Sequence, residues 1–156
     1  MKSLMSLILA AVILGGVALA QSPEKAGARS AKHKLIGAWR LVSMEEPGPD
    51  GNLKHITDRE GMLLYTRDGH MSVQLMLPKS ESGVSNDYVQ SGYEASFGKY
   101  DVNEQAHTIT HHVQGSVTRG LVGKDLARKF QFTPDGHLVI QSTLPDEHWS
   151  VTWEHY

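Results

Sequence analysis

Residues 97–117, FGKYDVNEQAHTITHHVQGSV, contain the clearest strand–turn–strand pattern of the chain. Apolar and polar residues alternate over residues 97–102 and again over residues 107–117, as expected for strands with one buried face. The four residues between them, 103–106, are polar or small and suit a hairpin connection. This segment therefore predicts two antiparallel strands joined by a short turn.

The same alternation recurs on both sides of this hairpin. Residues 67–69 (RDG) and 133–136 (TPDG) each separate two alternating runs, and Asp-Gly favours a hairpin turn because glycine accepts a positive φ. With one strand at each end of the domain, eight strands are predicted: 36–45, 62–66, 71–77, 97–102, 107–117, 126–132, 138–143 and 149–155. Residues 85–95 (SNDYVQSGYEA) are predicted to form a short helix that begins at Ser85 or Asn86.

Eight sequential antiparallel strands in one short domain are best accommodated by closing the sheet, because closure pairs the edge strands. We therefore expect an all-β fold over residues 35–156, an eight-stranded antiparallel up-and-down barrel with one short helix. A barrel of this size has room inside for side chains or for one small ligand.

The first 20 residues are predicted to be a signal peptide. Lys2 supplies the positive start, residues 4–14 the apolar stretch, and residues 18–20 (ALA) a cleavage site. A membrane anchor is the alternative, since the charge-free run is almost long enough to span a bilayer. Cleavage makes the protein periplasmic or secreted, with no stable membrane insertion. Residues 21–34 are polar and basic, and they are predicted to be a flexible lead-in.

The composition excludes several classes of function. The chain has 156 residues, with 15 Lys plus Arg against 17 Asp plus Glu, and it has no cysteine. This near-neutral balance argues against a nucleic-acid partner, because domains that bind phosphates are usually basic. The lack of cysteine excludes disulfides, thiolate metal sites and Cys nucleophiles. No cofactor is predicted, and we expect a monomer or a weak homo-oligomer.

Five stretches of the chain resemble one known family. They are GAWRLVS (37–43), GHMSVQL (69–75), GKYDV (98–102), THHVQGS (110–116) and RKF (128–130). In this order and spacing they are similar to the lipocalin-like domain family, small single-domain proteins of bacteria and fungi. The resemblance covers about residues 35–156 and implies a calycin-type barrel. It implies no agreed activity, although cyclising or isomerising roles have been proposed for fungal relatives in natural-product pathways.

Side chains alternate across a strand, so the apolar face of each strand indicates which residues point into the barrel. Five polar residues fall on those faces: Ser43, Tyr100, His111, Arg128 and Ser142. The residues predicted to bind a ligand are Tyr100, His111, Arg128, Ser43 and Trp39. No residue is assigned a catalytic role by these patterns alone.

Arg128 has two interpretations, because a charge inside a barrel requires a partner or a polar cavity. In the structural interpretation its guanidinium group stacks over Trp39 and donates to carbonyl groups. In the functional interpretation it holds a ligand carboxylate by two parallel hydrogen bonds.

Tyr100 lies beside His111 inside the barrel if Val102 pairs with Ile109. Such a pair could donate to a carbonyl group or transfer a proton near neutral pH. Alternatively it is a polar network that joins two core strands. A register slip by one residue would instead give a polar lining of Ser72, Gln74, His112 and Gln114.

No metal site is predicted. His111 and His112 point to opposite faces of one strand. His107 and His111 share a face, but they lie roughly 13 Å apart at about 3.3 Å per residue, too far to share one zinc ion.

These observations give three hypotheses of function. The first is an exported barrel that binds a small, largely apolar molecule in its interior. The second is an enzyme on the same barrel that catalyses isomerisation or cyclisation with a His/Tyr acid–base pair. The third is a packed barrel without a ligand whose surface contacts another component of the cell envelope.

Overall fold

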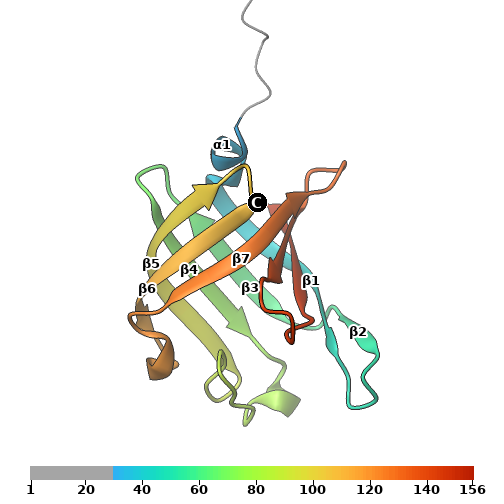
Figure 1. Cartoon of the computed structure of the whole chain (residues 1–156). Helices are drawn as coiled ribbons and strands as arrows, with labels where there is room; N and C mark the ends of the chain where they lie inside the picture. Colours follow the sequence, from blue (N-terminus) through green and yellow to red (C-terminus); the bar gives the residue numbers. More distant parts are fainter. Residues whose placement is uncertain (1–29) are drawn as a thin grey trace, which may run out of the picture.

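The computed structural model describes residues 30–156 (Figure 1). The predicted signal peptide and most of the predicted lead-in lie outside the described residues. In the described part, nine strands form one sheet in which every pair of neighbours is antiparallel. Their bounds are β1 Gly37–Pro47, β2 Leu53–Ile56, β3 Glu60–Tyr65, β4 His70–Met76, β5 Tyr93–Asn103, β6 Thr108–Ser116, β7 Asp125–Phe132, β8 Leu138–Ser142 and β9 Ser150–His155.

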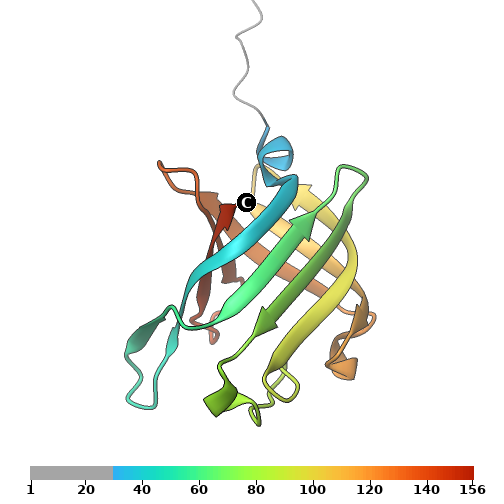
Figure 2. The same ribbon diagram turned by 180° about the vertical axis from the view of Figure 1, so that it is seen from behind.

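Eight of these strands close into a barrel. Strands β3 to β9 follow one another in chain order, and β1 pairs with β3 on one side and with β9 on the other. Figures 1 and 2 show the closed wall from opposite sides. The predicted eight-stranded antiparallel up-and-down barrel is therefore confirmed, and so is the presence of one short α-helix.

Strand β2 is an addition that the sequence pattern does not predict. The first four residues of β1 pair with β3, whereas its last four, Met44 to Pro47, pair with β2. Three of the four β2 residues are exposed. Because β2 has no buried face, it lacks the alternation by which the other strands are detected.

The short helix α1 (Ala31–Leu35) forms the last part of the predicted lead-in, so the folded region begins before residue 35. The Ser30 side chain caps it by accepting a hydrogen bond from the His33 N–H at 3.3 Å. Leu35 is fully buried, and Figure 1 shows α1 over one end of the barrel. No helix within residues 30–156 is long and apolar enough to cross a membrane.

The predicted helix over residues 85–95 is wrong. The Asn86 side chain accepts hydrogen bonds from two backbone N–H groups just after it, and it thereby stabilises a turn. Ser91 and Gly92 then have φ angles of 51° and 74°, which a right-handed helix does not allow. Strand β5 therefore begins at Tyr93. Two short 3-10 turns, η1 (Lys79–Glu81) and η2 (Arg119–Leu121), complete the structure.

The β5–β6 hairpin has the expected register. Val102 lies opposite Ile109, and Tyr100 lies opposite His111. His111 is buried inside the barrel, whereas its neighbour His112 is on the outer face. The alternative lining that a one-residue slip would give is therefore wrong.

The core fills the barrel from the α1 end. Its largest fully buried side chains are Trp39, Tyr65, Leu35, Leu63, Ile109 and Leu138. A smaller cluster of Leu75, Leu77 and Val89 forms where the segment between β4 and β5 folds back on the barrel. Figures 1 and 2 show this segment at the end opposite α1. Each such buried side chain contributes about 1.5–3 kcal/mol to folding.

Candidate functional site

The α1 end of the barrel interior is a packed plug around Trp39. This residue is 1% exposed, and its indole Nε1 donates a hydrogen bond to the Leu35 carbonyl oxygen at 2.8 Å. The His155 ring lies against it with 3.5 Å between ring centroids, and Phe132 packs beside it at 6.3 Å. The structure thus places Trp39, one of the predicted ligand-binding residues, where its polar atom is already bonded.

Arg128, on β7, is buried in the other half of the interior. Its guanidinium carbon lies 5.2 Å from the centroid of the Tyr88 ring and 5.0 Å from that of Trp149, so two aromatic rings enclose the charge. The expected stacking over Trp39 is wrong, because the rings come from two connecting segments at the opposite end of the barrel. Nη1 donates to the Ala127 carbonyl oxygen at 3.0 Å. Among residues 30–156 the arginines with a carboxylate within 4.0 Å are Arg40 and Arg59, not Arg128.

Glu147, in the segment before β9, holds this aromatic cage together. Its carboxylate accepts hydrogen bonds from Ser142 Oγ at 2.6 Å, from Tyr88 Oη at 2.9 Å and from Trp149 Nε1 at 3.0 Å. Burial alone would raise the pKa of Glu147, but these three donors outweigh it and lower the pKa below its ordinary value. Glu147 is therefore ionised at neutral pH and fully engaged, and it orients both rings that enclose Arg128.

His111 is hydrogen-bonded to Tyr65, with 2.7 Å between the tyrosine hydroxyl and Nε2. Burial, with a smaller effect of the Arg128 charge, lowers the pKa of His111 to about 3. Burial also raises the pKa of Tyr65 far above its ordinary value. Both side chains are therefore neutral at neutral pH. They offer hydrogen bonds but do not exchange protons there.

Tyr100 is beside His111 in the sheet but does not bond to it. Its hydroxyl donates to the Thr66 carbonyl oxygen at 2.9 Å, while its ring packs on Tyr65 with centroids 4.7 Å apart. The expected Tyr100–His111 pair is thus replaced by Tyr65–His111. The strand register predicts that Tyr100 is next to the His111 imidazole. It does not predict that the Tyr65 hydroxyl, which comes from β3, is the one that bonds to His111.

Glu94, on β5, is a half-buried carboxyl group that the sequence pattern did not select. It shares the inward face of β5 with Ser96 and Tyr100, and it lies opposite Leu75 of β4. Burial raises the pKa of Glu94 to about 7, and the Arg128 charge opposes that rise only in part. No hydrogen bond contributes to this pKa, in contrast to the three that lower the pKa of Glu147.

The two serines expected inside the barrel are buried, at 7% exposure for Ser43 and 5% for Ser142. Ser142 belongs to the cage through its hydrogen bond to Glu147. Ser43 lies on β1 at an irregularity in the pairing with β9. Of the five predicted ligand-binding residues, the Arg128 charge acts on His111. Trp39 lies apart from both, at the α1 end of the barrel.

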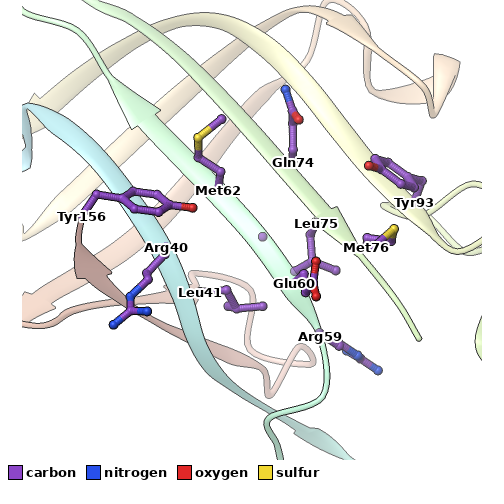
Figure 3. Close-up of a pocket in the computed structure, with 11 residues that line it drawn as sticks. Arg40, Leu41, Arg59, Glu60, Met62, Gln74, Leu75, Met76, Tyr93 and Tyr156 are labelled. Atoms are coloured by element: carbon purple, nitrogen blue, oxygen red, sulfur yellow. The ribbon is translucent and has the colours of Figure 1, made fainter. Parts of the chain in front are cut away.

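A separate groove of about 440 Å³ lies on the outside of the barrel (Figure 3). It opens where the pairing of β1 with β3 ends at Arg40 and Met62. Met62, Met76 and Tyr93 line it from the outer face, and each is exposed. None of the five predicted ligand-binding residues lines this groove.

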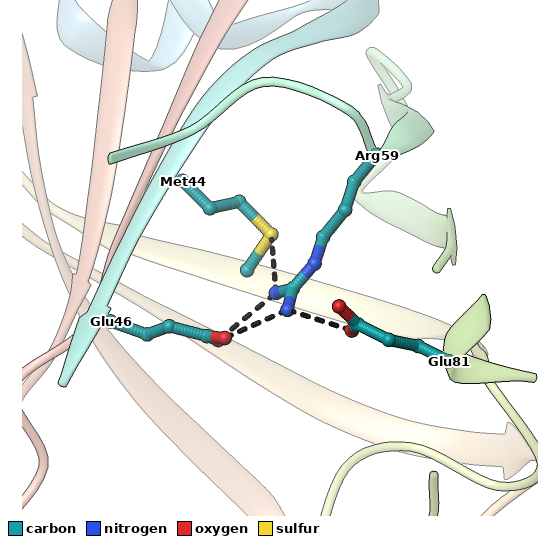
Figure 4. A network of polar contacts seen from close by, with 4 residues as sticks. All are labelled: Met44, Glu46, Arg59 and Glu81. Carbon is teal, nitrogen blue, oxygen red and sulfur yellow. Dashed lines mark hydrogen bonds and ion pairs between the residues drawn. The ribbon is translucent and has the colours of Figure 1, made fainter. Parts of the chain in front are cut away.

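Below the groove, Arg59 bridges the gap between β1 and η1 (Figure 4). Its Nη1 and Nη2 donate to the two carboxylate oxygens of Glu46 at 2.9 and 2.7 Å, and Nη2 lies 3.4 Å from Glu81. The hydrogen bonds that Arg59 donates to Glu46 raise the pKa of Arg59 further. This two-pronged ion pair replaces the missing backbone pairing and has a structural role.

Residues 30–156 contain no group of three or more His, Asp or Glu side chains arranged to hold a metal ion. The sequence model of the lipocalin-like domain matches residues 36–155. The chain belongs to this family. No curated protein matches it.

The sequence patterns did not select four residues of the site, and the fold of the lipocalin-like barrel explains why. Tyr88 and Glu94 fall in the segment predicted as a helix, and Glu147 and Trp149 lie at the end of a connecting segment. Two of them had a detectable signal: counting back in steps of two from Tyr100 reaches Glu94, and counting back from Trp153 in the predicted strand 149–155 reaches Trp149. Tyr88 and Glu147 have no periodic pattern, because connecting segments set their positions.

Proposed function

We propose that this lipocalin-like protein binds a small, largely apolar molecule in its interior, with an oxygen acceptor of the ligand, a carboxylate or a carbonyl group, on Arg128. The observation that carries the proposal is the environment of that side chain. Arg128 is 7% exposed and enclosed by Tyr88 and Trp149, and no carboxylate among residues 30–156 lies within ion-pair distance. A guanidinium group has five N–H donors, and the Ala127 carbonyl oxygen uses one of them.

A buried charge without an ion-pair partner is costly unless another group compensates for it. The two aromatic rings compensate in part through cation–π attraction. The N–H groups of Arg128 that are not bonded to the Ala127 carbonyl oxygen are suited to a planar oxygen acceptor. The apolar side chains of the interior, such as Val73, Val113 and Ile140, suit the rest of such a ligand.

An enzyme that uses His111 and a tyrosine as its acid–base pair is less well supported. His111 has a pKa of about 3 and its partner Tyr65 has a strongly raised pKa, so neither side chain changes its protonation near neutral pH. General acid–base catalysis is most effective when the pKa of the group lies near the working pH. We therefore assign the pair to hydrogen bonding in the interior.

The amino-terminal sequence supports export, and we propose that the barrel acts in the periplasm or outside the cell. In that setting the protein is a monomer or a weak homo-oligomer that carries its ligand without a cofactor.

Isothermal titration with decanoate, a carboxylate with an apolar tail, tests the proposed function. We expect saturable binding to the wild-type protein and a tenfold to hundredfold weaker affinity in Arg128→Met, because hydrogen bonds to charged groups contribute about 1.5–3 kcal/mol. Arg40→Met is the matched control, since Arg40 is an exposed arginine on the outer face. Absence of binding to the wild-type protein, or equal weakening in both variants, would contradict the proposal.

A further inference from the structure

Glu94 is the one carboxyl group on the inward face of β5, and the protein provides it with no hydrogen-bond donor among residues 30–156. It is half-buried, so a part of the residue remains accessible to solvent. Its nearest strand neighbour across the sheet is the apolar Leu75. This is an expensive arrangement for a carboxyl group, since burial without hydrogen bonds destabilises the charged form.

A structural role as counter-ion does not account for Glu94. Its carboxylate is not within 4.0 Å of the Arg128 guanidinium group, so the two interact only through space. The structural carboxylate near Arg128 is Glu147, which accepts three hydrogen bonds and orients Tyr88 and Trp149. The two acids of the interior therefore differ: Glu147 is fully engaged by the protein, whereas Glu94 has its acceptor oxygens free.

We propose that Glu94 accepts a hydrogen bond from a hydroxyl group of the bound molecule, so that the ligand is an apolar compound with both a hydroxyl group and a carboxylate or carbonyl oxygen. This inference rests on the proposed function, because it takes Arg128 as the contact for the oxygen acceptor. It adds a second polar contact, on a different strand, and with it the chemical class of the ligand.

A hydroxyl group fits Glu94 better than an amine does. Arg128 is close enough for its charge to affect the pKa of Glu94, and the same positive charge repels an ammonium group placed next to that carboxylate. A neutral hydroxyl donor gains a charge-assisted hydrogen bond without this repulsion. The interior thus selects a neutral donor near Glu94 and an acceptor near Arg128.

Glu94 also makes the binding of such a ligand depend on pH. The titratable groups around the interior are Arg128 on β7, His111 on β6, Tyr65 on β3, Tyr100 on β5, Tyr88 in the segment before β5, and Glu147 before β9. The pKa of His111 is about 3 and that of Glu147 is lowered, while the pKa values of the three tyrosines are raised. Glu94, with a pKa of about 7, is the group in this set that changes its charge between pH 5 and pH 8.

The experiment compares decanoate with hydroxydecanoates that carry the hydroxyl group at the second, third or fifth carbon. Isothermal titration at pH 5.5 and at pH 8.5 gives, for each protein, the ratio of the affinities of the best hydroxy acid and of decanoate. In the wild-type protein we expect this ratio to rise about tenfold from the lower to the higher pH, as the acceptor becomes a carboxylate. In Glu94→Gln, which keeps a neutral acceptor of the same shape, the ratio stays constant.

Two controls separate the possible failures. Glu60→Gln removes a carboxylate from the exposed outer groove and is expected to leave the wild-type pH dependence unchanged. 3-Aminodecanoate is expected to bind no better than decanoate at either pH. Circular dichroism confirms that each variant is folded.

The outcomes are distinguishable. If decanoate itself does not bind, the proposed function fails, and this inference fails with it. If decanoate binds but the ratio is independent of pH, falls with rising pH, or changes equally in Glu94→Gln, the role of Glu94 is overturned while the proposed function stands. A preference for the amino acid over the hydroxy acids would also overturn the proposed ligand class.

Discussion

Among residues 30–156, Arg59 and Arg128 both have little-exposed side chains, and their surroundings differ in kind. The Arg59 side chain is 7% exposed and is held by two carboxylates, with a two-pronged ion pair to Glu46 and a longer contact to Glu81. Arg128 is buried, at 7% exposure for the whole residue, but two aromatic rings enclose it and it has no ion pair among residues 30–156.

Under the proposed function, this difference separates an arginine that stabilises the fold from an arginine that contacts the ligand. Arg59 bonds to carboxylates through both of its terminal nitrogens and thereby joins β1 to η1. Arg128, which donates to one backbone carbonyl oxygen and has no ion pair among residues 30–156, keeps donors for another molecule. The same contrast separates the two interior acids, since Glu147 is saturated by hydrogen bonds and Glu94 has none.

The largest effect on stability is expected at the paired arginine. Arg59→Met leaves Glu46 and Glu81 without their cation, and breaking a buried pair costs 3–5 kcal/mol. Because the two carboxylates are partly exposed, we expect a loss of about 2–3 kcal/mol in the free energy of unfolding, measured by urea denaturation at pH 7. Arg40→Met, which breaks an exposed pair with Glu154, is the control and should cost about 0.5 kcal/mol. Equal losses of unfolding free energy in both variants would contradict the structural role of Arg59.

A smaller, pH-dependent effect is expected for the unpaired acid. The folded-state pKa of Glu94 is about 7, above the ordinary value of 4.5, so the folded protein holds its proton more tightly than the unfolded chain. This contribution to stability is fully present below about pH 4.5 and is lost as the pH rises through 7.

Between pH 5 and pH 8 the wild-type protein should therefore lose about 1–2 kcal/mol relative to Glu94→Gln. This is less than the full shift implies, because solvent reaches the half-buried carboxyl group. Urea denaturation of both proteins at each pH measures the difference, and the contribution of His111 is common to both. A difference that does not change with pH would mean that Glu94 is well solvated.

Arg128→Met should change stability less than Arg59→Met does. The substitution removes two cation–π contacts and one hydrogen bond, but it also removes the cost of a buried, unpaired charge. We expect the free energy of unfolding to change by about 1 kcal/mol or less, while decanoate binding weakens as described above. A loss of 3 kcal/mol or more would mean that Arg128 stabilises the fold, as Arg59 does, and would contradict the difference between the two arginines.

The smallest effect is expected on the outer face of the wall. His112 Nδ1 lies 2.6 Å from Asp125 and its Nε2 lies 2.9 Å from Asp101, and hydrogen bonds to these acids raise the pKa of His112. The stabilising effect of protonated His112 is fully present below the ordinary pKa of 6.5 and is lost as the pH rises through the raised pKa. Because all three groups are exposed, His112→Gln should cost about 0.5 kcal/mol or less at pH 6 and nothing at pH 9. Thermal denaturation at the two pH values measures this, and a larger cost at pH 9 would contradict it.

The sequence by itself determined the barrel and the inward face of most strands. Alternation with a period of two and Asp-Gly turns are local features, so they specified the hairpins and the register that puts His111 inside. They also placed Arg128 in the interior. They did not detect β2, which has no buried face, and they assigned a helix to residues 85–95, where Asn86 and Ser91 form turns.

Only the tertiary structure decided which side chains meet inside the barrel. Tyr65 reaches His111 from a strand 46 residues earlier in the chain, and Tyr88 and Trp149 come to Arg128 from two separate segments. Local patterns record which face of a strand is buried, but not how far a side chain reaches across a closed barrel or how a loop folds over its end. For that reason the sequence predicted that Arg128 is in the interior. Only the fold placed Tyr88 and Trp149 around Arg128 and left Glu94 without a hydrogen bond.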